Sequence, residues 1–479
     1  MPRMDISDHY DAIARCNRCG FCQVSCPIYR ATGHEAGVAR GRLALLRALI
    51  EDRISWSREL EEPLFACLLC GACTANCFPA VATVDLILAA RTEYLDRVSR
   101  SPLHRLLFNH LLPYPRRLRL AARAAALGKR SGISRVARAL GLLRFLGRDF
   151  PKAEAIVERF PAMAFRERFK AGSLSADEPR QSPLDASQSA VKRAEKPEGE
   201  EQQAPGIRPG GRATNTATSS ASALRIGYFV GCGVDILCPE AGEATVGLLR
   251  AMGASVTVLD NCCCGLPAET YGDRQAAQRL AAKNLELLAT EPLDLIATDC
   301  SSCAAFLKRY PRLFAPDDSR HQAAEAVASR VRDWMELAVG VESPESEAQS
   351  HEVPVSASEP GIARSRCLVV TYHDPCHASR GQGIAAQPRR VLQSLAGVEY
   401  RELPEADWCC GGAGSYALSH YDLSRRVLDR KIDNVEKTGA NVLATSCPAC
   451  IVHLSYGVRL RGLAVQVCHL SELMSGRIR

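Results

Sequence analysis

Thiol groups at short, repeated spacings are the residues of this chain that could do chemistry. The chain contains 22 cysteines among 479 residues, and most of them fall in groups separated by no more than three positions. Residues 1–15 contain no apolar secretory core, so we expect a chain that is not exported and that stays in a reducing cytosol. The grouping therefore favours metal ligation over disulfide bonds.

The first two groups share the spacing C-x2-C-x2-C-x3-C. The first run consists of Cys16, Cys19, Cys22 and Cys26, and the second of Cys67, Cys70, Cys73 and Cys77. This is the run of two-cluster bacterial ferredoxins, whose first three thiolates hold one [4Fe–4S] cluster while the fourth reaches the other cluster. We therefore expect one cluster on Cys16, Cys19, Cys22 and Cys77. We expect the second cluster on Cys67, Cys70, Cys73 and Cys26.

The loops that carry these runs must wrap closely around a cube of iron and sulfur. Gly20, Gly33 and Gly71 are expected to allow that approach, because glycine tolerates tight turns. The second run departs from the pattern in one respect, since Phe78 stands between its last cysteine and the following proline. A pair of structural zinc sites is the alternative, because eight cysteines would also satisfy two tetrahedral zinc ions.

Ten further cysteines form a pattern that occurs twice in the C-terminal half. The first copy consists of Cys232, Cys263, Cys264, Cys300 and Cys303, and the second of Cys376, Cys409, Cys410, Cys447 and Cys450. Corresponding cysteines lie 144 to 147 residues apart, and a glycine follows the adjacent pair in both copies. Such a constant offset indicates that one domain has been duplicated.

Each of these ten cysteines follows the carboxyl end of an expected parallel strand or begins the next helix. Open α/β sheets build their sites at that edge, and the N-termini of helices favour charged thiolates. Five thiolates in each copy exceed the four that one zinc ion needs, so we expect a multi-iron cluster. Cysteines that only pack, or one zinc ion with a spare thiol, are the alternatives.

The remaining cysteines and two nearby histidines have simpler interpretations. Free buried cysteine is common, so we expect packing roles for Cys238, Cys262, Cys367 and Cys468. Because Cys262 precedes the first adjacent pair, the register could shift by one, but the Cys-Cys-Gly sequence in both copies favours the pair assigned above. His373 and His377 flank Cys376, and we expect both to be hydrogen-bonding neighbours of the site instead of ligands.

The elements that must position these thiols divide into a helical part and two α/β parts. Apolar residues recur at helical spacing over 41–52, 84–98, 103–112 and 133–146. We expect strands at 225–230, 255–260, 293–298, 367–372, 398–402 and 442–445, with helices at 274–289, 388–396 and 423–438. The fold class is therefore α + α/β, a helical two-cluster ferredoxin module followed by two repeated α/β cysteine-rich domains.

Composition sets the boundaries between these parts. Residues 175–223 and 341–366 contain little that could form a core, and we expect them to be disordered linkers. The expected domains are a ferredoxin-type domain, a basic helical extension and two cysteine-rich domains, at 1–100, 101–174, 224–340 and 367–479.

Positive charge is concentrated in the helical extension. The net charge is +7, but residues 101–170 contain 16 Lys/Arg and 4 Asp/Glu. Such a stretch could face anionic lipid, nucleic acid or an acidic partner, or it could be a solvated surface. No run approaches 18 apolar residues, so we expect no membrane-spanning helix. No G-x-G-x-x-G or G-x4-G-K-[ST] motif occurs, so we expect the chain itself to bind neither flavin nor nucleotide.

These features resemble the iron–sulfur subunits of glycolate oxidase, the related lactate-utilisation subunits and the cysteine-rich subunit of heterodisulfide reductase. The resemblance rests on both cysteine runs and on the sequences YHDPCH at 372–377 and CCGGAGSY at 409–416. It covers nearly the whole chain except the two linkers. It implies an electron-transfer subunit of a 2-hydroxy-acid dehydrogenase that acts on glycolate or lactate.

The same resemblance implies partners and a location. A separate FAD-binding dehydrogenase chain would oxidise the acid, so we assign no catalytic side chain here. Electrons would pass through the two [4Fe–4S] clusters to a quinone, a membrane cytochrome or another acceptor that is not NAD. The chain would be cytoplasmic, in contact with the inner face of the membrane, and would bind no nucleic acid.

A disulfide reductase of the heterodisulfide reductase type is the alternative. In that family the cysteine-rich modules hold non-cubane clusters that cleave a disulfide. Glycolate-type subunits are expected to have an eroded second C-x2-C pair, whereas this chain keeps both Cys447 and Cys450. That departure strengthens the alternative, and the sequence leaves open whether each module holds iron, zinc or neither.

Overall fold

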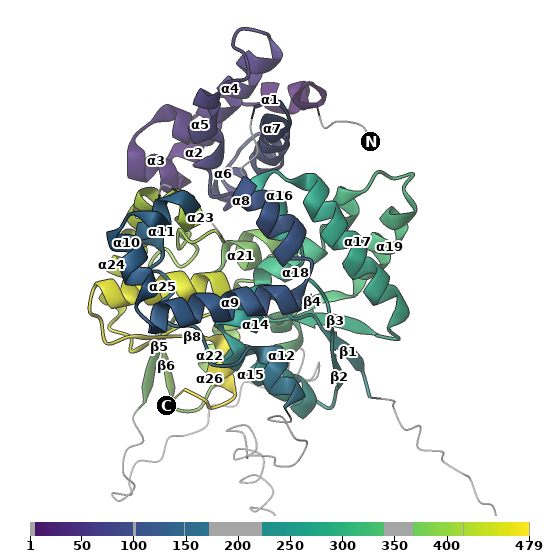
Figure 1. The fold of residues 1–479 in the computed structure, drawn as a ribbon, viewed down its shortest axis with the longest axis vertical. Coiled ribbons are helices and arrows are strands. Elements are labelled where there is room, and N and C mark those ends of the chain that lie inside the picture. The colour runs from purple at the N-terminus through teal and green to yellow at the C-terminus, as the bar shows by residue number, and fades with distance from the viewer. Residues whose placement is uncertain are drawn as a thin grey trace, which may run out of the picture.

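The chain folds into a helical N-terminal part that lies on two α/β parts (Figure 1). The computed structural model describes residues 5–98, 102–147, 149–171, 223–339, 367–414 and 416–478. The linkers expected at 175–223 and 341–366 fall outside these ranges, apart from residue 223. None of the helices in the described ranges combines the length and the apolarity needed to cross a bilayer.

The N-terminal part is organised around the two longest of its helices, α4 (Ala39–Ile50) and α7 (Thr83–Arg97). The shorter helices are η1 (Ile6–His9), α1 (Tyr10–Ala14), α2 (Phe21–Ser25), α3 (Pro27–Thr32), η2 (Glu35–Gly37), η3 (Arg58–Leu60), α5 (Glu61–Phe65) and α6 (Ala72–Ala75). Leu43 and Leu46 of α4 pack with Ile87 of α7 in one buried cluster. The helices predicted at 41–52 and 84–98 are confirmed, displaced by one or two residues.

The basic extension crosses both α/β parts, with α9 spanning the two in Figure 1. Its helices are α8 (Pro102–Leu106), the π-helical turn η4 (Leu107–Leu111), α9 (Pro115–Arg130), α10 (Ile133–Ala139), η5 (Leu142–Leu146), α11 (Phe150–Ala153) and α12 (Phe165–Lys170). The helix predicted at 133–146 is interrupted at Gly141, which has a φ of 71° and starts a 3-10 turn. The sequence analysis did not predict α9, the longest helix of the extension.

The first α/β part is a parallel four-stranded sheet with strand order β2-β1-β3-β4. Its strands are β1 (Arg225–Tyr228), β2 (Ser255–Val258), β3 (Leu295–Thr298) and β4 (Val331–Asp333). Its helices are α14 (Cys232–Leu237), α15 (Pro239–Ala251), α16 (Leu266–Tyr271), α17 (Arg274–Thr290), α18 (Ser301–Leu307), η6 (Tyr310–Leu313), α19 (Ser319–Arg330) and α20 (Trp334–Ala338).

The second α/β part repeats this topology with strand order β6-β5-β7-β8. Its strands are β5 (Leu368–Tyr372), β6 (Val398–Tyr400), β7 (Val442–Thr445) and β8 (Gln466–His469). Its helices are α21 (Cys376–Gln382), α22 (Ala386–Ser394), α23 (Tyr416–Ser419), α24 (Tyr421–Thr438), α25 (Pro448–Leu460) and α26 (Leu470–Met474). The two matching sheets confirm the predicted fold class and the duplication.

The fourth strand of each sheet was missed by the sequence analysis. Both strands are short, and each ends in a residue that caps the next helix. Asp333 forms a capping box with Glu336, and His469 forms one with Glu472. A strand of three or four residues that leads straight into a helix has no alternating pattern of its own, so only its pairing with β3 or β7 identifies it.

The helical part contacts both α/β parts. Arg91 of α7, which is buried, donates hydrogen bonds to the carbonyl oxygen of Cys67 at 2.6 Å and to that of Thr270 in the first α/β part. The hydroxyl of Tyr416 in the second α/β part donates to the carbonyl oxygen of Ala66 at 3.1 Å. The loop that carries the second cysteine run is therefore held against both sheets.

Candidate functional site

The two cysteine loops of the helical part have the same backbone shape. The residue before the second cysteine of each run, Arg18 or Leu69, has a φ of 54° or 52°. The glycine after that cysteine, Gly20 or Gly71, has a φ of 89° or 74° and caps the next helix. A left-handed conformation costs a non-glycine residue about 1 kcal/mol or more. Both loops therefore maintain the same strained turn where their cysteines converge.

These turns gather the eight cysteines around two neighbouring cavities. One cavity is lined by Cys16, Cys19, Cys22 and Cys77, and the other by Cys26, Cys67, Cys70 and Cys73. Each cavity thus receives three thiols from one run and the last thiol of the other run, the grouping expected from the sequence. Cys73, Ala39 and Thr83 line both cavities, so the two sites adjoin.

The chemistry of this donor set fits a cationic metal cluster. Burial raises the pKa of Cys26 and raises that of Cys73 to about 12. Thiolates in such a place need a positive partner, and bound iron supplies it. Arg42 lines the second cavity, and its Nη2 atom is buried without a hydrogen-bond partner. Four buried thiols beside an unpaired guanidinium nitrogen fit the negative charge of a thiolate-bound [4Fe–4S] cluster.

Helix α4 carries an arginine to each cavity. Arg40 lines the first cavity and Arg42 the second. The residue between them is Gly41, where an added Cβ would lie 2.0 Å from the carbonyl oxygen of Glu35. Only glycine lets α4 start so close to the preceding turn. The Arg-Gly-Arg sequence therefore has a physical role that its position between the runs did not reveal.

Backbone amides point at several of the sulfur atoms. The N–H of Leu69 donates to Cys67 Sγ at 3.4 Å, and the N–H of Val81 donates to Cys77 Sγ at the same distance. Such hydrogen bonds raise the potential of an iron–sulfur cluster. Gly33 does not belong to this environment. It ends α3 with a φ of 71° and lines neither cavity, so the expectation that it helps the chain approach a cluster is wrong.

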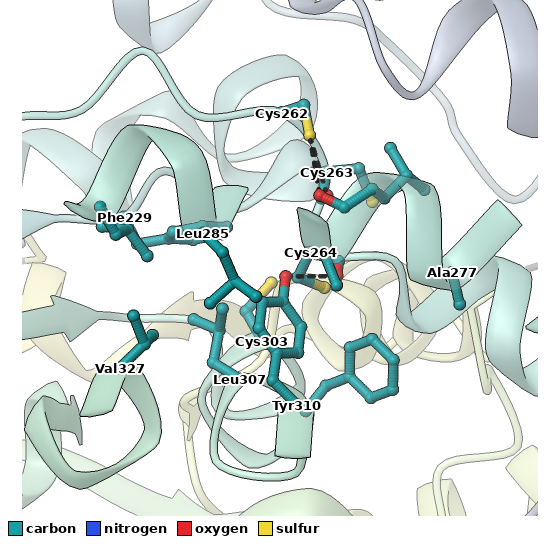
Figure 2. Packing of buried hydrophobic residues seen from close by; sticks show 14 of the residues in the cluster. Phe229, Cys262, Cys263, Cys264, Ala277, Leu285, Cys303, Leu307, Tyr310 and Val327 are labelled. Carbon is teal, nitrogen blue, oxygen red and sulfur yellow. Dashed lines mark hydrogen bonds between the residues drawn. The ribbon is translucent and has the colours of Figure 1, made fainter. Parts of the chain in front are cut away.

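The five cysteines of the first α/β part lie at the carboxyl edge of its sheet, as expected. Cys232 begins α14 after β1, and Cys300 caps α18 after β3. The Sγ atoms of Cys232 and Cys263 are 3.8 Å apart. Figure 2 shows Cys262 turned to the carbonyl oxygen of Cys263. Cys262 is buried and bonded within the core, which agrees with the register chosen from the sequence.

Neighbouring thiols stabilise the thiolate form inside this group. Hydrogen bonds from Cys263 and Cys303 lower the pKa of Cys264 to about 5. The hydroxyl of Tyr310 donates to the carbonyl oxygen of Cys264 at 2.7 Å, as Figure 2 shows, and holds the adjacent pair in place. Asn284 donates to the carbonyl oxygen of Cys263 at 3.1 Å. The pair therefore presents its sulfur atoms on a backbone fixed by two polar core residues.

The five cysteines of the second α/β part lie at the matching edge. The Sγ atoms of Cys410 and Cys450 are 3.4 Å apart, and the thiol of Cys409 contacts that of Cys376. Hydrogen bonds from Cys409 and Cys450 hold the pKa of Cys410 well below its usual range. His377 accepts or donates a hydrogen bond at 3.0 Å with Ser302, as expected for a neighbour of the site.

The two groups of five form one continuous array. The thiol of Cys300 in the first part contacts that of Cys447 in the second. The next residue of the first group, Ser301, donates its backbone N–H to the carbonyl oxygen of Ser446 at 3.2 Å. The carboxyl edges of the two sheets therefore meet, and the ten cysteines line their junction. The sequence gives no sign of this meeting, because it depends on how the two copies pack.

The array also reaches the helical part. The thiol of Cys70, from the second cysteine run, contacts that of Cys409. Arg380 of α21 spans this contact, since it donates to the carbonyl oxygen of Cys70 at 3.3 Å and pairs with Asp407 at 2.7 Å. The thiols thus run without interruption from the ferredoxin cavities into the second α/β part. Arg380 was not singled out in the sequence, where nothing distinguishes it from other arginines.

The other cysteines lie outside these groups. Cys238 and Cys468 are buried in apolar clusters, and Cys367 is exposed at the start of β5. These positions agree with the expectation that they are not ligands.

Comparisons with known families match each part of this architecture. Residues 12–80 match the 4Fe-4S dicluster domain, and residues 226–308 and 370–455 match the cysteine-rich CCG domain. Residues 99–157 match the linker region of the glycolate oxidase iron-sulfur subunit. Fold and site together define an iron–sulfur electron-transfer protein with a two-cluster ferredoxin module and two CCG domains.

Similar proteins agree along the chain. The "Probable glycolate oxidase iron-sulfur subunit" of Bacillus subtilis is 28% identical over 473 residues, 96% of this chain and 93% of that protein. "Lactate utilization protein A 2" of Bacillus mycoides is 30% identical over 255 residues, 53% of this chain and all of that protein. A glutamate racemase structure from Bacillus anthracis overlaps 53% of this chain and 80% of its own at 11% identity, with a TM-score of only 0.25.

The chain belongs to the family of glycolate oxidase iron–sulfur subunits, which includes the lactate utilisation proteins A. As a member with the complete dicluster domain, it carries two [4Fe–4S] clusters. The family expected from the cysteine runs and the Cys-Cys-Gly sequences is confirmed.

Proposed function

We propose that this chain is the electron-transfer subunit of a flavin-dependent 2-hydroxy-acid dehydrogenase that oxidises glycolate or lactate. The observation that carries the proposal is the likeness to a glycolate oxidase iron–sulfur subunit, which extends through the ferredoxin module, the linker region and both CCG domains. A separate FAD chain holds the substrate and supplies the electrons. A quinone, a membrane cytochrome or another acceptor other than NAD removes them.

The side chains of this chain hold and tune the electron carriers. We assign one cluster to Cys16, Cys19, Cys22 and Cys77, and the other to Cys26, Cys67, Cys70 and Cys73. Each [4Fe–4S] cluster, when bound, takes up and releases one electron at a time. Arg42 and the amides of Leu69 and Val81 offset the negative charge around the sulfur atoms. The contact between Cys70 and Cys409 supports a path that continues into the CCG array.

The test is reduction of the clusters by the hydroxy acid in the intact complex. The tagged chain is purified without oxygen together with the chains that it retains, and low-temperature EPR is recorded after addition of glycolate, lactate or acetate. We expect a retained FAD chain and a reduced-cluster signal with glycolate or lactate but not with acetate, which has no hydroxyl group to oxidise. Clusters that stay oxidised with both hydroxy acids in a flavin-containing complex would contradict the proposal.

Disulfide reduction is a second candidate, because the structure has a complete cysteine set in each CCG domain and joins the two sets. Cys300 and Cys447 meet at the junction, where a disulfide could be reached by both groups. The same anaerobic preparation is assayed with reduced methyl viologen and oxidised glutathione or cystine. Turnover of a disulfide without any response to hydroxy acids would favour this candidate over the first.

A lipid contact through the basic extension is a further part of the proposed function. Leu120 and Leu127 of α9 are 68% and 67% exposed, and they alternate along the helix with Arg116, Arg123 and Arg130. Their spacing places these five residues on one outward face. An exposed face of leucine and arginine suits the surface of an anionic bilayer.

Removing the two leucines should weaken binding to lipid. For L120S/L127S we expect at least about tenfold weaker flotation with vesicles of phosphatidylcholine and phosphatidylglycerol, because each buried leucine contributes about 1.5 kcal/mol or more. I54S, which replaces an exposed residue of the helical part, is the matched control. Equal flotation of all three proteins, or no flotation of the unmodified protein, would remove this contact from the account.

A further inference from the structure

His373 occupies an unusual position in the second α/β part. It follows β5 directly, its backbone is fixed on both sides by β7, and its side chain is only 1% exposed. Its N–H donates to the carbonyl oxygen of Ala444 at 3.0 Å, and its carbonyl oxygen accepts from Thr445 at 3.1 Å. Neither ring nitrogen has a hydrogen-bond partner. Burying an imidazole with both nitrogens unpaired is unfavourable unless something else satisfies one of them.

Two thiols lie beside the unpaired ring. One ring nitrogen of His373 and the sulfur atoms of Cys410 and Cys450 all lie within 4.8 Å of one another, and all three residues are buried. Imidazole nitrogen and thiolate sulfur at such distances are a typical donor set for zinc or iron. The thiol of Cys447 contacts that of Cys450 and can complete a set of four donors.

The duplicated domain provides an internal comparison. At the offset that relates Cys376 to Cys232, the position of His373 is taken by Phe229, and at the offset that relates Cys450 to Cys303, His453 corresponds to Phe306. Both phenylalanines are buried, and Figure 2 shows Phe229 in the apolar cluster of the first part. The two copies therefore keep the same thiols but differ in whether imidazoles surround them.

The two histidines of the second copy differ from each other. His453 has a partner on each ring nitrogen, the carbonyl oxygen of Cys410 at 2.8 Å and the hydroxyl of Ser424 at 3.0 Å. Its bonds support the Cys-Cys-Gly turn, so His453 is a positioning residue. His373 has no such bonds and lies beside two thiols, so its free nitrogen is available to a metal.

We propose that His373 is a metal ligand together with Cys410 and Cys450. The second CCG domain then holds zinc or iron in a mixed imidazole–thiolate site, whereas the first surrounds its metal with thiolates and phenylalanine. The inference corrects the expectation that His373 is a hydrogen-bonding neighbour. It rests on the proposed assignment of these cysteines as ligands and is independent of the electron path through the ferredoxin clusters.

The experiment compares H373F with H453F in the full-length chain, purified without oxygen. H373F copies the residue of the first domain and should lose the metal of the second domain, while the EPR signals of the two ferredoxin clusters stay unchanged. H453F should keep that metal. In the unmodified protein, zinc-edge X-ray absorption should show a nitrogen scatterer at about 2.0–2.1 Å with sulfur at about 2.3 Å. If the metal is iron, coupling to 15N-histidine replaces that readout.

A cysteine at the same position tests whether a ligand, and not a shape, is lost. H373C should recover the metal with a sulfur-only shell. Full metal content with an unchanged spectrum in H373F would overturn the proposal, as would a sulfur-only shell in the unmodified protein. A second domain without metal in the unmodified protein would also overturn it, while intact ferredoxin signals would leave the electron-transfer proposal standing.

Discussion

The double variant Cys16→Ser/Cys77→Ser should lose only one cluster, although it alters both cysteine runs. These two residues line the same cavity, so their replacement should remove about four iron ions per chain. The variant Cys16→Ser/Cys26→Ser alters only the first run but affects both cavities. It should lose about eight iron ions, because a serine hydroxyl does not replace a thiolate ligand to iron.

Iron and acid-labile sulfide, measured per chain against the unmodified protein, decide between the two pairings. Cys367→Ser is the control, because this cysteine is exposed and lies outside every group. Both double variants should reduce electron transfer from the dehydrogenase to a dye by at least about 100-fold. If each run held its own cluster, the two double variants would exchange their iron losses, and the crossed assignment would be wrong.

The second large effect is expected at a buried ion pair that ties the basic extension to the first CCG domain. Asp235 of α14, which is 1% exposed, pairs with Arg166 at 3.0 Å and with Arg119 at 3.1 Å. It also accepts the backbone N–H of Arg166 at 3.0 Å. Asp235→Ala should lower the free energy of unfolding by about 3–5 kcal/mol, because it leaves two largely buried guanidinium groups without their carboxylate.

The measurement is the midpoint of thermal unfolding under anaerobic conditions, which should fall by roughly 5 °C. Asp294→Ala is the matched control, since Asp294 pairs with Arg225 at the surface, where an ion pair contributes about 1 kcal/mol or less. Equal shifts for the two variants would show that the extension is not held by this buried pair.

The sequence was most informative where chemistry constrains spacing. The C-x2-C-x2-C-x3-C runs predicted how the eight cysteines would divide between two cavities, because the reach of one short loop determines which thiols can meet. The constant offset between Cys-Cys-Gly sequences predicted two copies of one parallel sheet, and the matching strand orders confirm it. Cysteines at carboxyl ends of strands followed from the same rule.

Features that depend on packing between distant segments were missed. The strands β4 and β8 are identified only by their neighbours, and α9 contains arginines and alanines without a wide apolar stripe. The contacts Cys300–Cys447 and Cys70–Cys409 join parts whose arrangement no local pattern encodes. His373 was weighed as an ordinary neighbour, because its missing partners are visible only once the fold is known.

The account depends most on thiols that hold iron and sulfide for electron transfer. Its most direct test is the iron and acid-labile sulfide content of the unmodified chain, purified and analysed without oxygen. We expect a brown protein with at least about eight iron and eight sulfide ions per chain, the number for two [4Fe–4S] clusters. A colourless protein that contains zinc and no sulfide at the cysteines of the helical part would contradict the account.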